Sequence, residues 1–101
     1  MEYNITTQGA VTTARLIGRL DTPAAQECGP ALEALSEKAD GTLILDCKEL
    51  SYISSSGLRI FLTLRKAAVA KGGKVIVKSI CPDIRNVFVM TGFLNLFEIE
   101  D

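Results

Sequence analysis

Three consecutive serines, Ser54, Ser55 and Ser56, stand before Gly57 and a strongly apolar helical pattern. A serine hydroxyl in this place can cap the helix by accepting a backbone N–H, or it can accept a phosphoryl group. A phosphate would be stabilised there, because a helix N-terminus offers free N–H groups and the positive end of the helix dipole. Spacing alone favours capping, since serine caps are common, and phosphorylation is the alternative. One cap does not need three serines.

Asp21 is a second candidate for a functional side chain, because it stands directly before Thr22-Pro23 at the predicted start of another helix. Aspartate is a preferred capping residue, and proline is favoured in the first helical turn. We therefore interpret Asp21 first as a helix cap. Arg59 is expected on the solvated face of the helix that follows the serines.

The composition excludes most acid–base and metal chemistry. The 101 residues include no histidine, which removes the Ser-His-Asp and Cys-His triads and most zinc and haem sites. Cys28, Cys47 and Cys81 lie far apart without CxxC spacing, which predicts neither a zinc site nor a disulfide framework and fits a reducing cytoplasm. A serine hydrolase would need a GxSxG elbow, and none is present. We expect no catalytic residue, no metal and no cofactor.

Charge and hydropathy predict a soluble cytoplasmic protein. Eleven basic and twelve acidic residues give a formal charge of −1, so no electrostatic footprint for nucleic acid or an anionic membrane is visible. The N-terminus has no signal-peptide pattern, and no apolar run approaches the roughly 18 residues of a membrane span. We expect a single domain over residues 1–101. A monomer is expected, with a dimer paired through an edge strand as the alternative.

Hydrophobic periodicity predicts an α/β fold that begins with a β-hairpin over residues 2–8 and 11–17. The predicted helices run from 22 to 39, from 55 to 71, and from Ser79 or Cys81 to Gly92. The later strands are predicted over 42–46, 74–78 and 96–100. A bend or restart is expected at Gly29-Pro30 in the first helix, because proline removes a donor and clashes one turn back. This order implies a mostly parallel sheet with right-handed crossovers.

Strand parity predicts how many helical layers cover the sheet. One set of alternate strand positions is apolar: Leu43, Leu45, Val75, Val77, Phe97 and Ile99. The other set is half polar, whereas strands covered on both faces read as near-continuous apolar runs. The helices are therefore expected on one face of a two-layer sheet, with Ile17, Ile44 and Ile76 exposed on the open back. The apolar stripe of the helix over 55–71 is expected to comprise Leu58, Phe61, Leu62, Ala68 and Val69.

Four segments, in order, resemble the STAS domain of bacterial anti-sigma-factor antagonists. The family's Gly-x-Leu-Asp before the first helix is similar to Gly18-Arg19-Leu20-Asp21. Its strand, short acidic turn and aromatic-hydrophobic-Asp-Ser-Ser-Gly-Leu are matched by Leu45-Asp46 through Leu58. Gly72-Gly73-Lys74 and Met90-Thr91-Gly92-Phe93 resemble its last two units. The resemblance covers nearly the whole chain and departs from the pattern at Ser54, where the family usually has aspartate.

The resemblance implies a STAS fold and a partner switch controlled by phosphorylation. In such a switch the unphosphorylated protein binds an anti-sigma factor that is also a serine kinase, and a sigma factor is released. Phosphorylation abolishes binding, and a serine phosphatase restores it. The resemblance places the phosphorylated serine at Ser55, with Ser54 and Ser56 as less favoured acceptors. The implied partner-binding residues are Asp21, Ser54, Ser55, Ser56, Gly57 and Arg59.

Two other functions remain open at this point. A STAS scaffold, or an accessory subunit of a stress-signalling or transporter complex, could dock through the back-face isoleucines. A receiver-like domain could instead be phosphorylated on Asp46, at the predicted end of a strand. Receivers hold Mg²⁺ with an acidic pair at the end of the first strand and carry helices on both sheet faces. Residues 3–7 contain no acidic pair, so the receiver is disfavoured.

Overall fold

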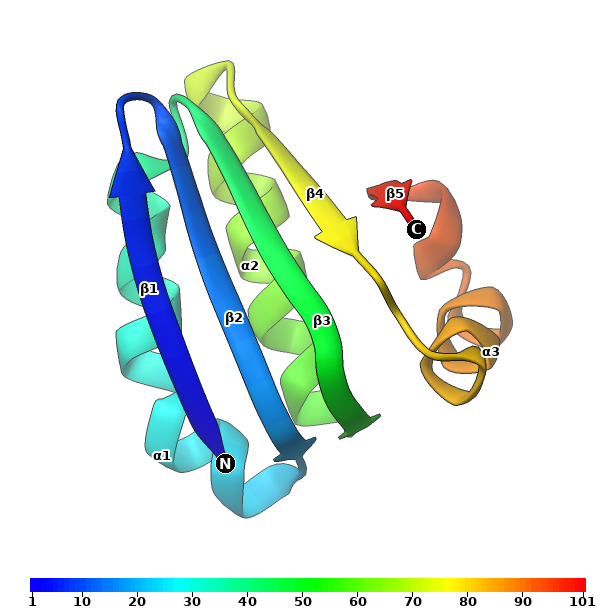
Figure 1. Cartoon of the computed structure of the whole chain (residues 1–101). Coiled ribbons are helices and arrows are strands. Elements are labelled where there is room, and N and C mark those ends of the chain that lie inside the picture. The colour runs from blue at the N-terminus through cyan, green and yellow to red at the C-terminus, as the bar shows by residue number, and fades with distance from the viewer.

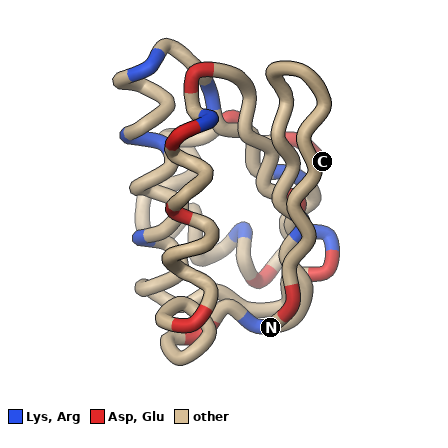
Figure 2. The backbone as a smooth tube through the Cα atoms, turned by 90° about the vertical axis from the view of Figure 1, so that its left-hand side faces the viewer, with Lys and Arg blue, Asp and Glu red and all other residues tan.

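The computed structural model describes residues 1–101 and has two layers, a five-stranded sheet and the helices that cover one of its faces (Figures 1 and 2). The strands are β1 (Glu2–Gln8), β2 (Val11–Leu20), β3 (Thr42–Ile53), β4 (Lys74–Lys78) and β5 (Glu98–Glu100). The helices are α1 (Thr22–Glu33), α2 (Ser55–Lys71) and α3 (Pro82–Thr91), with 3₁₀ turns at Ala34–Lys38 and Phe93–Asn95. The predicted hairpin and the one-sided α/β architecture are confirmed.

The strands lie in the sheet in their chain order, β1-β2-β3-β4-β5. β1 and β2 are antiparallel, and every later neighbouring pair is parallel. The carboxyl ends of β2, β3 and β4 therefore point the same way, and the helix that follows each strand begins there. Figure 1 shows α1 and α2 starting at this edge, under the ends of β2 and β3. This edge is where the three serines lie.

The apolar strand positions form one wall of the core, as parity predicted. Leu43, Leu45, Val75 and Val77 are buried, as is Phe97 just before β5. Aromatic contacts join this wall to the helices. The Phe61 ring of α2 lies 6.2 Å from that of Phe88 in α3 and 6.3 Å from that of Phe97, both edge to face. Such pairs add about 0.5–1.5 kcal/mol each beyond their buried area, so they help to hold the C-terminal third of the chain against α2.

The buried face of α2 differs from the predicted stripe. Val69, expected in the core, is 67% exposed, whereas Ile60 and Leu64 are buried. The side chain of Ile60 reaches α1: a Cβ added to Gly29 would lie 3.6 Å from its Cδ1. Because α2 packs against a neighbouring helix as well as the sheet, its buried face is wider than one stripe and includes Ile60 and Leu64, which the predicted stripe omits.

The first helix does not break at Gly29-Pro30. α1 continues through Pro30 to Glu33 and then tightens into the 3₁₀ turn. Cys28 and Leu32 are buried on either side of Pro30. Packing on both sides of the proline thus holds the helix together across the missing backbone donor.

Three strand boundaries were also predicted wrongly. β2 runs to Leu20 rather than residue 17, and β3 runs to Ile53 rather than Asp46. Two register shifts in the β2–β3 pairing change which side chains of β3 point into the core. The polar stretch after Asp46 therefore lacks regular alternation and was predicted to be a turn, although it is paired strand. β5 begins at Glu98 rather than residue 96, because the 3₁₀ turn occupies Phe93–Asn95.

The open back of the sheet is not the exposed isoleucine stripe that was predicted. Ile76 is only 6% exposed, and Ile17 and Ile44 are half-buried. Glu98 is the registered neighbour of Ile76 and pairs with Lys74 across the strands, N to O 3.7 Å. Long charged side chains cover apolar surface with their stems. The scaffold alternative therefore loses the docking stripe on which it depended.

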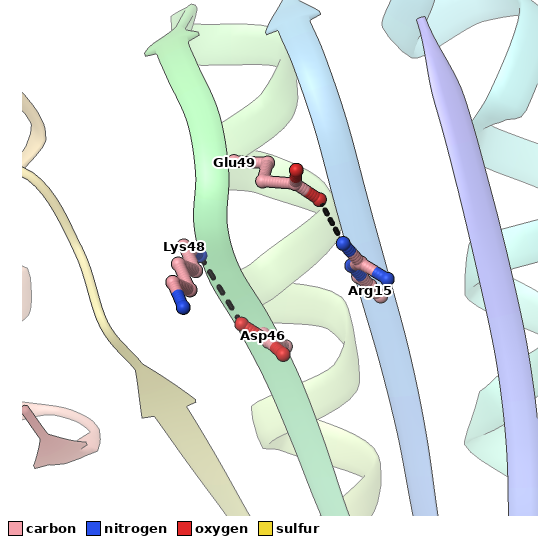
Figure 3. A network of polar contacts seen from close by, with 4 residues as sticks. All are labelled: Arg15, Asp46, Lys48 and Glu49. Carbon is pink, nitrogen blue, oxygen red and sulfur yellow. Dashed lines mark hydrogen bonds and ion pairs between the residues drawn. The ribbon is translucent and has the colours of Figure 1, made fainter.

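Asp46 lies on this back face within β3, well before the strand ends. Its carboxylate accepts a hydrogen bond from the backbone N–H of Lys48 at 3.1 Å, and Arg15 of β2 pairs with Glu49 beside it (Figure 3). In a receiver domain the phosphorylated aspartate lies at the end of a strand, and helices cover both faces of the sheet. Neither condition holds, which excludes the receiver-like alternative.

Burial of Cys47 predicts a loss of stability in alkali. The thiol, on β3, is 0% exposed. Burial, with a smaller effect of the charge on Asp46, raises the pKa of the Cys47 thiol from 9.0 to about 12. The unfolded chain releases this proton near pH 9 and the folded chain does not. The stabilisation is therefore complete below pH 9 and is lost as the pH rises from 9 towards 12.

Urea unfolding of the Cys47→Ala variant tests this prediction. Between about pH 8 and about pH 10.5, Cys47→Ala should lose about 2 kcal/mol less unfolding free energy than the wild type. Val77→Ala removes buried volume without a titrating group, so it should lower stability at both pH values and keep the wild-type pH dependence. Equal losses in Cys47→Ala and the wild type would contradict the role of the thiol.

Candidate functional site

The predicted site residues come together where β2 and β3 end. Leu20 pairs with Ile53 at the last position of the parallel ladder. The next residue in each chain segment, Asp21 and Ser54, begins a helix, so the amino ends of α1 and α2 lie side by side (Figure 1). Each helix end offers unsatisfied N–H groups and a positive dipole end. The edge is therefore suited to negative charge.

Asp21 caps α1, as its position predicted. Its Oδ1 accepts a hydrogen bond from the backbone N–H of Ala24 at 3.0 Å, and Pro23 occupies the first turn. The side chain is half-buried. Its role in binding a partner stays a prediction.

Ser54 is the capping serine of α2. Its hydroxyl accepts a hydrogen bond from the N–H of Gly57 at 3.2 Å and donates one to the carbonyl oxygen of Leu20 at 3.0 Å. The residue is only 9% exposed. An ionised aspartate could accept from Gly57 but could not donate to Leu20, which gives the departure from the family pattern a local reason. A hydroxyl that is enclosed and used twice is a poor phosphoacceptor.

Ser55 and Ser56 are the first two residues of α2, and the cap leaves both hydroxyls for other uses. Ser55 is exposed, and Ser56 is half-exposed towards α1. The three serines therefore have three different environments. The structure separates one structural hydroxyl, that of Ser54, from a serine that is exposed at the positive end of a helix, Ser55.

Gly57 lets α2 approach the strand ends closely. A Cβ built on it would lie 2.8 Å from Cγ1 of Ile53 and 2.8 Å from Cγ of Leu20. Real Cβ atoms are not found at such distances, so any side chain here would displace the side chains of Ile53 and Leu20 or the helix itself. The predicted place of Gly57 in the site has a packing explanation, and its contact with a partner stays a prediction.

Arg59 lies one turn along α2 from Ser55 and is exposed. With Ser56 it lines a shallow groove of about 240 Å³ between the two helices. Gln26 and Glu33 of α1 line the other side. Ser55 immediately precedes the groove-lining Ser56 and lies one helical turn from Arg59, so a partner that covers Ser55 and this groove would also reach Arg59.

Sequence reasoning missed a pair beside the serines. The guanidinium carbon of Arg19 lies 4.3 Å from the centroid of the Tyr52 ring, a cation–π contact. These residues are neighbours in the β2–β3 register and immediately precede Leu20 and Ile53. Only the pairing of two strands distant in sequence brings them together, so no local pattern signalled the contact.

Away from this edge, the largest hollow measures about 300 Å³ and is lined by Thr7, Thr12 and Lys38 among others, near the β1–β2 turn. Nowhere in the structure do three or more His, Cys, Asp or Glu side chains gather as a metal site would require. None of the helices combines the length and apolar character that crossing a membrane requires.

Comparison with known proteins decides the family. The sequence pattern of the family described as the STAS domain matches residues 2–101. The chain belongs to the STAS family. A STAS relative from Bordetella bronchiseptica, BtrV, which is provisionally named an anti-sigma factor antagonist, is 33% identical over 88 residues, covering 87% of this chain and 76% of that protein.

Solved STAS structures share the fold. The anti-sigma factor antagonist SpoIIAA in its unphosphorylated form superposes with a TM-score of 0.76 at 22% identity, covering 99% of this chain and 88% of that one. The phosphorylated form of the Bacillus cell fate determinant SpoIIAA gives 0.75 at 22% identity, covering 97% and 90%. Anti-sigma factor antagonists of the STAS family are regulatory, non-enzymatic proteins, in agreement with the expectation that this chain is no enzyme.

The double use of the Ser54 hydroxyl predicts a structural cost that Ser55 does not share. Ser54→Ala leaves the Gly57 N–H without its cap partner and should lower the unfolding free energy by about 1–2 kcal/mol. Ser55→Ala, at an exposed position, should stay within about 0.5 kcal/mol of the wild type. Urea unfolding of both variants at neutral pH is the measurement, and equal losses would refute this assignment of the cap.

Proposed function

We propose that this STAS protein is an anti-sigma-factor antagonist that works in the cytoplasm as a phosphorylation-controlled partner switch. Unphosphorylated, the surface around Ser55 binds an anti-sigma factor that is also a serine kinase, and a sigma factor is released. Phosphorylation of Ser55 abolishes binding, and a serine phosphatase restores it. The observation that carries the proposal is the exposed Ser55 hydroxyl at the amino end of α2, left free because Ser54 makes the cap.

The relatives support the general role and the kind of switch. BtrV and SpoIIAA are both named as anti-sigma factor antagonists. SpoIIAA has been solved unphosphorylated and phosphorylated, and the two forms match this fold equally well, with TM-scores of 0.76 and 0.75. This similarity favours a switch that acts through surface charge and leaves the fold in place.

Electrostatics account for the size of the affinity loss expected when Ser55 is phosphorylated. A phosphoserine carries a charge of about −1.5 to −2 at neutral pH, and the chain has a formal charge of −1. The free N–H groups of α2 stabilise the added charge within the protein. Under a partner, the same charge would be desolvated and opposed by like charge at a cost of a few kcal/mol, which corresponds to an affinity loss of about 10²-fold or more.

The proposed binding surface surrounds Ser55 on a single copy of the chain. It comprises Asp21, Ser54, Ser55, Ser56, Gly57 and Arg59. Asp21 and Ser54 hold the two helix ends in place, and Gly57 allows their close approach to the strands. Arg59 and Ser56 line the groove that a partner would cover. Because one copy carries the whole surface, a monomer is sufficient for the switch.

Substitution of Ser55 tests the proposal with a candidate anti-sigma kinase from the same organism. Ser55→Ala should bind the kinase in a pull-down and take no label from radioactive ATP. Ser56→Ala is the matched neighbour and should be labelled like the wild type. Ser55→Asp carries one charge instead of about two, so it should weaken binding less than phosphorylation does.

Undiminished labelling of Ser55→Ala would refute the site. If the wild type shows neither kinase binding nor labelling, the partner-switch function fails, and a scaffold without a switch becomes the better account.

A further inference from the structure

Arg59 is an exposed cation without an acidic partner near the proposed phosphoacceptor. None of the three ion pairs in the protein includes it. Its guanidinium group makes no hydrogen bond within the protein, and outside the helix ladder only its carbonyl oxygen is engaged, accepting from Oγ1 of Thr63 at 3.0 Å. The guanidinium group is therefore uncommitted in the unphosphorylated protein.

Arg59 lies on the same face of α2 as Ser55. The two residues are four apart on α2, so their Cβ atoms lie one above the other, about 5–6 Å apart. Side chains on a helix lean towards its N-terminus, so a long side chain at position 59 covers the turn that holds Ser55. A guanidinium group offers a planar pair of N–H donors that fits two phosphate oxygens.

Other charges around this turn compete weakly for Arg59 or for the phosphate. Glu33 of α1 lines the same groove but is exposed and makes no ion pair with Arg59. Asp21 accepts the capping hydrogen bond of α1. Arg19, near the end of β2, is stacked on Tyr52. A phosphate with about two negative charges on the same helix is therefore the best available partner for Arg59.

We propose that Arg59 is the intramolecular counter-ion of the phosphate on Ser55. The inference rests on the proposed function, because it takes Ser55 as the acceptor. Phosphorylation then has two effects on the docking surface: it adds an anion, and it withdraws a cation that was free to pair with an acidic side chain of the partner. Arg59 acts through the phosphate and is a positioning residue of the switch.

The test measures the phosphate directly by ³¹P NMR in protein carrying phosphoserine incorporated at position 55 during translation, so it needs no kinase. A neighbouring cation favours the dianion and lowers the second pKa of the phosphate. Arg59→Gln should therefore raise that pKa by about 0.2–0.4 relative to the wild-type sequence. Arg59→Lys keeps the charge and should restore most of the wild-type value.

Lys66→Gln is the matched control. Lys66 is exposed on the same face of α2, three turns beyond Ser55 and about 16 Å from it along the helix. This distance exceeds the screening length of about 10 Å in 0.1 M salt. Removing Lys66 changes the net charge equally and should leave the phosphate pKa unchanged. An unchanged pKa in Arg59→Gln, or an equal rise in Lys66→Gln, would overturn the proposal.

Binding to the anti-sigma kinase supplies a second readout. Unphosphorylated Arg59→Gln should bind the kinase several-fold more weakly than the unphosphorylated wild type. The phosphorylated forms of the two proteins should bind alike. The ratio of unphosphorylated to phosphorylated affinity should therefore be smaller in Arg59→Gln. If the wild type binds no such kinase, the proposed function fails while the ³¹P titration still decides the role of Arg59. Normal binding and labelling with an unchanged phosphate pKa would overturn the counter-ion alone.

Discussion

At the carboxyl edge of the sheet, the carbonyl oxygen of Leu20 accepts two hydrogen bonds from Ser54, one from its backbone N–H at 2.9 Å and one from its hydroxyl at 3.0 Å. The same hydroxyl accepts the N–H of Gly57. A carbonyl has two lone pairs and a hydroxyl both donates and accepts, so these few atoms join the end of β2, the end of β3 and the start of α2. The junction fixes where α2 begins, and with it the places of Ser55, Ser56, Gly57 and Arg59.

The junction gives adjacent serines different roles. Ser54 is enclosed and serves the fold, while Ser55, the next residue, is exposed on a helix end that cannot shift easily. Close packing of Gly57 against Leu20 and Ile53 resists displacement of α2. A rigid helix end suits a switch that works through charge, because the added phosphate changes what the surface repels and attracts without first rearranging the core.

Much of the fold could be predicted, and the errors have a common cause. The one-sided layering followed from strand parity, because Leu43, Leu45, Val75 and Val77 alternate with a set of positions that is only half apolar. Parity failed along β3, where register shifts change the phase of alternation, and at Ile76, which charged neighbours cover on the open face. Ile60 was left out of the predicted stripe of α2 because the periodicity of one helix does not reveal a second packing partner, here α1. Each error involves a contact between segments distant in sequence.

The sequence by itself determined the chemical character of this protein. Without histidine it has no near-neutral acid–base group, and three serines before an apolar helix carry both capping and phosphoacceptor chemistry wherever that helix lies. Only the tertiary structure decided which serine caps the helix and which is left exposed. The choice depends on the Leu20 carbonyl, 34 positions before Ser54 in the chain, and parallel pairing of β2 with β3 brings that group within hydrogen-bonding distance of one hydroxyl and leaves the next in solvent.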